Sequence, residues 1–444
     1  MTISINCSMI DIKVKYGKNM LEKVLQEEFI SILREELVPA MGCTEPIALA
    51  YAAAKGREAL GCEPERIIAK CSGNMIKNVR CVTIPNSGGL TGIETACVLG
   101  SLAGNPAAGM EVLEKVGNTE RARTKELLEK GCCRVEYLDS DIPLHFIIEL
   151  FARGHMAEVE VRHTHTNIVS VVKDGEVLFE KAKELADKGY STDRSGLSLD
   201  TIKAFADEVE LAEIRDIYER QIRCNMDIAY EGISGDYGIG IGRMLRESYA
   251  DGVVTRMKAF AAAASEARMG GCDMPVIINS GSGNQGIASS VPVIVYAREK
   301  NITTEKLYRA LAFSSLLTIY QKEFIGKLSA FCGAVSASCA SAAAITYMAG
   351  GTIQQIKATI DNTLANIPGI ICDGAKISCA AKIASSLDAS MMAHYLAMQG
   401  KEYEAYTGIL KEDAGETISC VGYIGKVGMH QTDKEIIKMM LESR

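Results

Sequence analysis

Two long stretches of the chain carry no charged side chain, and they strongly restrict the structures it can form. They are residues Leu328–Ile356 and Met274–Ala297, each longer than the roughly 20 residues that a helix needs to cross a bilayer. The first consists mainly of Ala, Ser, Gly and Cys, and the second contains Pro275, Pro292 and several polar amides. Insertion into lipid favours large apolar side chains, which are few here. We therefore expect both stretches to form a buried protein core, with no membrane segment.

The composition indicates a folded globular protein. The chain has 444 residues, 48% hydrophobic and 23% charged, which suggests two or three domains and argues against disorder. The net charge is −8, no Lys/Arg-rich run occurs and Trp is absent, so nucleic acid is not an expected partner. The N-terminal sequence MTISINCSMIDIKVKYG lacks the pattern of a secretory signal, which makes the cytoplasm the expected location.

Helical and strand patterns alternate in the first part of the chain. Helices are expected over residues 20–60, 94–116 and 119–131. Pro39 should interrupt the first of them, and Glu45-Pro46 should restart it, because proline is favoured in the first turn of a helix. Period-two alternation in HMAEVEVRHTHTNIVSVVKDGEVLFE predicts a β-hairpin that turns at Asp174-Gly175. We place a mixed α/β unit at residues 62–182.

After a polar linker, the pattern is helical almost to the end of the chain. Helices are expected near residues 199–208, 210–230, 251–268, 304–322, 335–348, 352–364, 378–397 and 432–442. Their Ala- and Ser-rich composition should let helix axes approach closely. The predicted fold class is α+β, in which residues 20–60 and 195–444 form a mostly helical domain and residues 62–182 form an inserted mixed α/β domain.

Cys43 is a candidate catalytic residue. In the segment PAMGCTEP it follows Gly42 and comes just before a predicted helix start. A thiol there should face unpaired N–H groups and the positive end of the helix dipole, and both would lower its pKa. The small residues around it leave room for a ligand. The alternative is a buried cysteine that only caps the helix.

The loop NSGSGNQG is a second candidate site. Its residues Gly281–Gly286 match the dinucleotide-binding fingerprint, but that motif should open a βαβ unit with an acidic residue on a second strand about twenty positions later. Glu299 instead lies in helix-like sequence, and Pro292 should interrupt the expected helix. An NAD(P)-dependent oxidoreductase is therefore the weaker interpretation. The alternatives are a small-anion site made by backbone N–H groups with Ser282, Asn284 and Gln285, and a purely structural loop.

The chain has fifteen cysteines, and its size and missing signal exclude a secreted disulfide scaffold. Five cysteines lie in the last third: Cys332, Cys339, Cys372, Cys379 and Cys420. No CxxC pair indicates a zinc site. One continuous helix would separate Cys372 from Cys379 by about 10 Å, whereas a loop at Cys372 would let the two approach each other. Metal ligands and small buried residues are both consistent with this pattern.

Polar residues of the predicted α/β unit are candidates for substrate binding. His163 and His165 point to the same side if they lie on a strand, but the sequence places no third metal ligand beside them. His165 is therefore a candidate substrate contact, with a domain interface as the alternative. Asn74 belongs to SGNMIKN, a Gly- and amide-rich turn of the kind that binds carboxylates. A structural turn is the alternative there.

Taken in order, the segments PAMGCTEP, SGNMIKN, SGSGNQG, KLSAFCGAVSAS and GIICDGAKISCAAK resemble the serine dehydratase-like alpha chain family, and within it the L-cysteine desulfidases. The resemblance extends from about residue 20 to the C-terminus. It implies an enzyme that needs no pyridoxal phosphate and holds a [4Fe-4S] cluster on three cysteines. Carried over by motif, the ligands are Cys332, Cys372 and Cys379, and Cys43 is the catalytic base.

The resemblance implies a lyase that removes hydrogen sulfide from L-cysteine by β-elimination and gives pyruvate and ammonia. An L-serine dehydratase with the same mechanism is the alternative, since only the leaving group differs. A non-catalytic redox or ligand-sensing protein is a further hypothesis. The expected partner is a small amino acid. Enzymes of this kind often form homo-oligomers, but the sequence identifies no interface and assigns no role to Cys339, Cys420 or His163.

Overall fold

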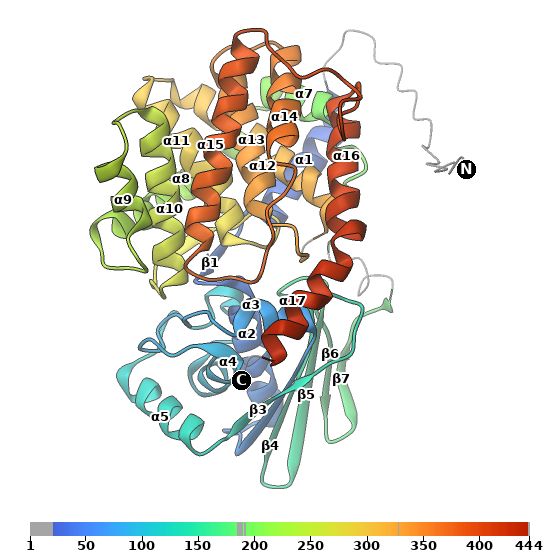
Figure 1. Cartoon of the computed structure of the whole chain (residues 1–444). Helices are drawn as coiled ribbons and strands as arrows, with labels where there is room; N and C mark the ends of the chain where they lie inside the picture. The colour runs from blue at the N-terminus through green and yellow to red at the C-terminus, as the bar shows by residue number, and fades with distance from the viewer. Residues whose placement is uncertain (1–20, 184–189, 191, 327, 443–444) are drawn as a thin grey trace.

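The computed structural model describes residues 21–183, 190, 192–326 and 328–442. Helices account for 58% of the structure and strands for 12%. Most of the helices gather in one part of the molecule, and the main sheet lies in the other (Figure 1). This arrangement confirms the predicted α+β class.

The helical part is built around a helix of small residues. Its helices are α1 (Lys23–Glu36), α7 (Leu199–Glu208), α8 (Leu211–Ser234), α9 (Ile241–Ser248), α10 (Val253–Met269), α11 (Gly283–Glu299), α12 (Thr304–Ile325), α13 (Gly333–Met348), α14 (Ile353–Asn366), α15 (Cys379–Met398) and α16 (Ala414–Tyr423). Helix α13 contacts α11, α12, α14 and α15. Its residues 334–346 are all buried, because the Ala, Ser and Cys side chains let several neighbours pack closely around one axis.

The main sheet formed by the described residues has six strands in the order β3-β2-β4-β5-β6-β7. These are β2 (Arg66–Cys71), β3 (Cys133–Tyr137), β4 (His145–Ala152), β5 (His155–Arg162), β6 (Ile168–Lys173) and β7 (Glu176–Glu180). The β2–β3 pair is parallel, and the other pairs are antiparallel. The predicted turn at Asp174-Gly175 joins β6 to β7, and both residues have positive φ.

Helices α2 (Thr44–Leu60), α3 (Gly73–Val79), α4 (Gly92–Ala103) and α5 (Asn118–Glu129), with the short turn η1 (Gly109–Glu111), accompany the sheet. Helix α2 packs on α4 and on strands β4, β5 and β6. The boundary that we placed after residue 60 therefore separates elements that pack together, because α2 buries its Ala-rich surface against the sheet. The division of the chain into two domains otherwise remains a prediction.

Within the described residues, pairing of two short strands and a C-terminal helix connect the sheet part to the helical part. Strand β1 (Pro39–Met41) pairs antiparallel with β8 (Pro275–Ile277), which directly precedes the NSGSGNQG loop. At the other end of the chain, α16 continues through a π-helical turn, η2 (Ile424–Gly428), into α17 (His430–Glu442). Helix α17 contacts α3 (Figure 1). Helix α17, at the C-terminal end of the described chain, thus reaches from the helical part to the sheet part.

Several local predictions were wrong. The helix expected over 94–116 ends at Ala103, because Gly104 leaves the helical conformation and Asn105 precedes a proline. Pro292 does not interrupt α11, which is buried along most of its length, so packing outweighs the one backbone hydrogen bond that proline removes. Sequence patterns also missed β1, α3 and α16, which are short or Gly-containing.

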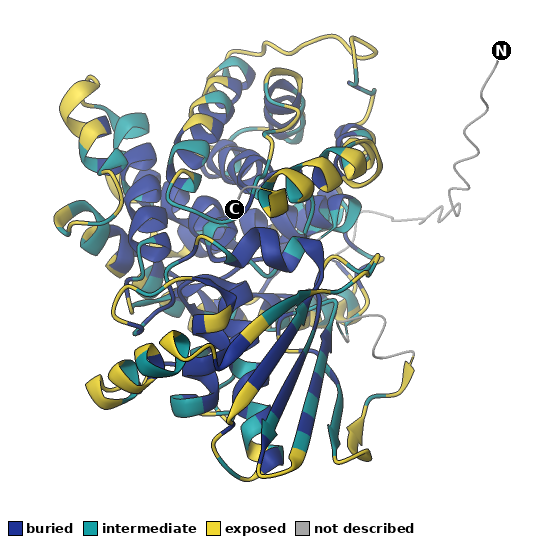
Figure 2. Ribbon diagram, turned by 60° about the horizontal axis from the view of Figure 1, so that its bottom comes forward, coloured by how far each residue is buried: buried dark blue, intermediate teal, exposed yellow. Residues whose placement is uncertain are grey.

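Figure 2 shows buried residues throughout the helical core and the middle strands of the sheet, whereas α5 and β7 are exposed. Most residues of the two uncharged stretches lie inside this core, as expected, although Ala349, Gly350, Thr352 and Gln354 are exposed. Among the described helices, none has both the length and the hydropathy that crossing a bilayer requires.

Candidate functional site

Four helices of the described chain begin at one small cavity. Cys43 is the N-cap of α2, Ser282 that of α11 and Cys332 that of α13, while Cys379 is the first residue of α15. All four residues line a cavity of about 90 Å³, together with Cys372. None of the three N-cap side chains accepts a capping hydrogen bond. The positive ends of four helix dipoles therefore meet at one place, which favours negative charge there.

The loops that carry Cys332 and Cys372 pair with each other through their backbones. The Cys332 N–H donates to the Ile370 carbonyl at 2.9 Å, and the Cys372 N–H donates to the Ala330 carbonyl at 2.7 Å. Phe331 and Ile371 form a β-bridge between these bonds. This short ladder fixes two cysteines side by side, although they are distant in the sequence.

The sulfur atoms of these two residues also interact. The interaction with the Cys332 thiol lowers the pKa of Cys372, assisted by the positive charges of Lys77 and Lys382. The same interaction and burial raise the pKa of Cys332. Burial also raises the pKa of Cys379, which is close enough to feel the charge of Cys372. The three thiols that the family resemblance assigns as ligands thus lie in one cavity.

This donor set fits an iron–sulfur cluster better than a single metal ion. Among the residues that the structure describes, no three His, Cys, Asp or Glu side chains are arranged around a single-ion position. A polynuclear cluster has a different requirement, because each cysteine binds a different iron atom and thiolates are its usual ligands. Three thiols surrounded by helix N-termini and lysines can meet this requirement.

Cys43 occupies the predicted position, but its predicted ionisation is wrong. Its thiol is 1% exposed and donates a hydrogen bond to Glu45 Oε2 at 3.1 Å. Burial and the negative charge of Glu45 raise the pKa of Cys43 well above its ordinary value. Desolvation and the carboxylate therefore outweigh the helix dipole. Glu45 also accepts hydrogen bonds from Thr44 Oγ1 at 3.0 Å and from Asn78 Nδ2 at 3.4 Å.

The NSGSGNQG loop forms another wall of the cavity, with Ser282, Asn284 and Gln285 in the lining. Ser280 and Gly281 both have positive φ, and the Gly281 carbonyl, 2.9 Å from Thr44 Oγ1, is the other acceptor within reach of the single Thr44 hydroxyl proton. Among the described strands, β8 pairs with β1 alone and antiparallel. The βαβ unit that dinucleotide binding requires is therefore not formed here.

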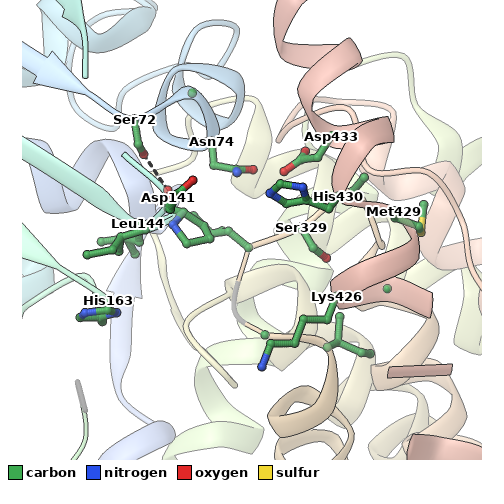
Figure 3. A pocket seen from close by; sticks show the side chains of 18 of the residues that line it. Ser72, Asn74, Asp141, Leu144, His163, Ser329, Lys426, Met429, His430 and Asp433 are labelled. Carbon is green, nitrogen blue, oxygen red and sulfur yellow. Dashed lines mark hydrogen bonds between the residues drawn. The ribbon is translucent and has the colours of Figure 1, made fainter. Parts of the chain in front are cut away.

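The two predicted substrate contacts from the sheet part have different positions. His165 lines the cavity, and a Cβ on Gly281 would lie 3.0 Å from its ring, so the histidine closely approaches the loop. Asn74 instead lines a neighbouring cavity of about 440 Å³, as does His163. Figure 3 shows Asn74 and Ser72 on one side of that larger cavity and His430 and Asp433 of α17 on the other. Lys322, Leu328 and Ser329 line both cavities.

Lys77 connects this region to the C-terminal helix. Its ammonium group, 1% exposed, lies 2.5 Å from Asp433 Oδ1 and donates to the Ser329 and Cys372 carbonyls, each at 3.4 Å. The three N–H donors of a lysine are thereby matched by three acceptors. A Cβ on Gly374 would lie 2.3 Å from the Lys77 carbonyl, so the Cys372 loop packs directly against α3.

Sequence analysis missed four residues of this region: Glu45, Lys77, Asn78 and Arg268. Glu45 follows Cys43 by two positions at a helix start, which could have indicated a proton acceptor. Lys77 and Asn78 lie in the SGNMIKN segment, in which the amide-rich turn pattern pointed to Asn74 alone. Arg268, at the end of α10, also lines the cavity, and nothing in its local sequence distinguishes it.

The fold and the site define a class of α+β proteins in which cysteines at the starts of several helices line one cavity. The chain belongs to the serine dehydratase alpha chain family, whose model matches residues 107–438. This family indicates a lyase and includes iron–sulfur serine dehydratases.

Relatives align with nearly the whole chain. A UPF0597 protein of Lachnoclostridium phytofermentans is 46% identical over 417 residues, which cover 94% of this chain and all of the relative. UPF0597 proteins of Desulfitobacterium hafniense and Treponema denticola are 45% and 46% identical, and the alignments cover 94% and 95% of this chain and 96% and 99% of the relatives. Their names state no activity.

Proposed function

We propose that this protein is an iron–sulfur lyase that acts without pyridoxal phosphate and converts L-cysteine to pyruvate, ammonia and hydrogen sulfide. The main observation in support is that Cys43 and the three cysteines Cys332, Cys372 and Cys379 line the same cavity. Membership of a family that includes iron–sulfur dehydratases also supports it. The assignment to L-cysteine rests on the sequence resemblance to the desulfidases.

In this proposal, Cys332, Cys372 and Cys379 hold a [4Fe-4S] cluster. A cluster with three protein ligands supplies one iron with an open position, which can serve as a Lewis acid toward the substrate. Lys77 and Lys382, whose charges act on Cys372, would help to balance the negative charge of the thiolates. The four helix N-termini would act in the same direction.

Cys43 and Glu45 form the proposed path for the substrate proton. The Cα proton passes to the Cys43 sulfur, and the proton of the thiol passes to Glu45 Oε2 across the 3.1 Å hydrogen bond. A raised thiol pKa is useful here, because the corresponding thiolate is a stronger base toward a weakly acidic C–H bond. Thr44 and Asn78 hold the Glu45 carboxylate in place.

The electron pair of the Cα–H bond forms the Cα=Cβ double bond while the Cβ–S bond breaks and hydrosulfide leaves. The resulting aminoacrylate tautomerises to an imine, and water hydrolyses the imine to pyruvate and ammonia. Net consumption is one L-cysteine and one water. The buried cavity would delay the entry of bulk water until the elimination is complete.

The alternative is L-serine dehydratase activity by the same steps, with hydroxide as the leaving group. The family to which the chain belongs is that of the serine dehydratase alpha chain. This family description favours the alternative. The residues that remove the proton would be unchanged.

The test is an assay of both amino acids after anaerobic reconstitution with iron and sulfide. We expect pyruvate and sulfide in equal amounts from L-cysteine, with slower pyruvate formation from L-serine. Faster turnover of L-serine would support the alternative, and no pyruvate from either substrate would contradict the lyase proposal. Cys339→Ala is a suitable control variant, because Cys339 is buried within α13 and does not line the cavity.

A further inference from the structure

Arg268 is a buried cation for which the described residues supply no carboxylate partner. It is 2% exposed and lines the cavity that contains Cys43 and the three proposed ligands. Its Nε has no hydrogen-bond partner in the structure, and among the described residues no ion pair involves it. Arg194, another deeply buried arginine, contacts both Glu36 at 2.5 Å and Glu323 at 2.7 Å. Because a guanidinium group stays charged, its burial without an anion is costly.

The immediate surroundings of Arg268 increase this demand for negative charge. A Cβ on Gly283 would lie 2.2 Å from Arg268 Nε, so the guanidinium group packs against the first residue of α11. The start of α11 is itself a positive helix end whose Ser282 N-cap makes no side-chain cap hydrogen bond. Two positive groups are therefore adjacent in a buried cavity. A carboxylate would satisfy both, since guanidinium binds its two oxygens in parallel.

Gln285 supplies the complementary group in the same cavity. Its Oε1 is buried and has no hydrogen-bond partner, and the amide group is held close to the start of α13, since a Cβ on Gly333 would lie 2.5 Å from its Cδ. An unpartnered acceptor is suited to an ammonium group. The cavity thus presents one unpaired cation and one unpaired acceptor.

We propose that Arg268 binds the α-carboxylate of the substrate and that Gln285 Oε1 accepts a hydrogen bond from its α-ammonium group. The site then recognises a free α-amino acid through both of its charged groups. This inference deepens the proposed function, because it names the groups that recognise the substrate. It also changes the role of Gln285 from a carboxylate contact to an ammonium contact.

The test compares ligands that differ by one group and cannot undergo elimination. L-alanine and L-alaninamide are titrated calorimetrically into anaerobically prepared protein, since the amide lacks only the carboxylate charge. We expect the wild type to bind L-alanine about a hundredfold more tightly than L-alaninamide. Arg268→Gln should reduce this ratio to near one, and Arg268→Lys should leave a ratio of about ten. Equal binding by the wild type, or no binding of either ligand, would overturn the proposal.

Arg256→Gln is the matched control, because Arg256 lies on the same helix and pairs with Asp251 and Glu299 outside the cavity. It should keep the wild-type ratio. If Arg268 only balances the charge of the thiolates, Arg268→Gln will also keep that ratio, which would refute the carboxylate role. If circular dichroism shows that Arg268→Gln does not fold, the Arg268→Lys variant provides the test. A wild-type ratio of L-alanine to L-alaninamide affinity in Arg268→Lys would overturn the assignment of Arg268 to the carboxylate.

The ammonium contact has its own comparison. Propionate lacks the ammonium group of L-alanine, and we expect the wild type to prefer L-alanine about tenfold. Gln285→Leu should abolish this preference while keeping the preference for L-alanine over L-alaninamide. An unchanged preference in Gln285→Leu would contradict the role of Gln285. A wild type that discriminates among these ligands as expected but forms no pyruvate would refute the proposed function. That result would still support the recognition of an amino acid by Arg268 and Gln285.

Discussion

Cys332 and Cys372 are held side by side by two backbone hydrogen bonds between their loops, and their thiols shift each other's pKa in opposite directions. The backbone ladder sets the position of both residues before any ligand binds. Both thiols line the same cavity, where they can share one bound group. Such preformed sites bind with less loss of conformational entropy.

The proton path through Cys43 and Glu45 predicts a specific pair of defects. Glu45→Gln keeps the size of the side chain and removes its ability to accept a proton, so the turnover number should fall by about 10²–10⁴. Cys43→Ser should cause a loss in the same range. Iron content should be unchanged in both variants, because neither residue is a proposed ligand.

Steady-state pyruvate formation and iron analysis on the same samples provide the measurement. Asn78→Asp is an informative companion, because it replaces a donor to Glu45 with a second acid. If Glu45→Gln retained more than half of the wild-type turnover number, Glu45 could not be the proton acceptor.

The buried pair of Lys77 and Asp433 predicts a strong effect on stability. Lys77→Met would leave the buried carboxylate without its partner, so the free energy of unfolding should fall by about 3–5 kcal/mol. The double variant Lys77→Met with Asp433→Leu should recover much of this loss, because an apolar pair can replace a buried ion pair. Urea denaturation measures all three proteins.

An ion pair between a buried lysine and an exposed carboxylate serves as the control. Lys258 contacts Asp388, whose side chain is 57% exposed, so Lys258→Met should lower the free energy of unfolding by no more than about 1 kcal/mol.

The double variant of Lys77 and Asp433 still lacks the hydrogen bonds that Lys77 donates to the Ser329 and Cys372 carbonyls. We therefore expect faster amide hydrogen exchange around Cys372 in the double variant even where global stability returns, and exchange at the wild-type rate would contradict this role of Lys77.

The buried His394 should contribute to the pH dependence of the free energy of unfolding. Burial lowers the pKa of His394 from 6.5 to about 4, and its Nδ1 lies 2.8 Å from Thr346 Oγ1. The unfolded chain therefore takes up a proton at higher pH than the folded protein. The contribution of this histidine to stability is constant above pH 6.5 and decreases as the pH falls from 6.5 to 4, by roughly 3 kcal/mol.

The measurement is the melting temperature of wild type and His394→Gln at several pH values. The variant should lose less stability than the wild type between pH 6.5 and pH 4, whatever its stability at neutral pH. Parallel curves for the two proteins over this interval would mean that His394 does not titrate as described.

Sequence patterns predicted the long helices and the hairpin well, because periodicity records which face of an element is buried. They failed for β1, a three-residue strand that forms through pairing with β8 across the fold. Pro292 was misjudged for a related reason, since the tight packing around α11 outweighs a local preference.

The candidate site was predictable only in part. A loop at Cys372 could be expected from the neighbouring Pro368-Gly369 and Asp373-Gly374, and the family resemblance supplied the set of cysteines. The raised pKa of Cys43 could not be foreseen, because it depends on complete burial and on the direction of the Glu45 side chain. Arg268 could not be identified either, since what distinguishes it is the missing partner in three dimensions.

The most direct test of the account is the iron and acid-labile sulfide content of the protein after anaerobic reconstitution. We predict about four of each per chain and a brown colour that bleaches in air. Replacing Cys332, Cys372 or Cys379 with Ser should abolish or greatly reduce both contents, whereas Cys339→Ser should retain them. A wild-type protein that stays colourless with less than one iron per chain, or a Cys372→Ser variant with the full content, would contradict the proposed cluster site.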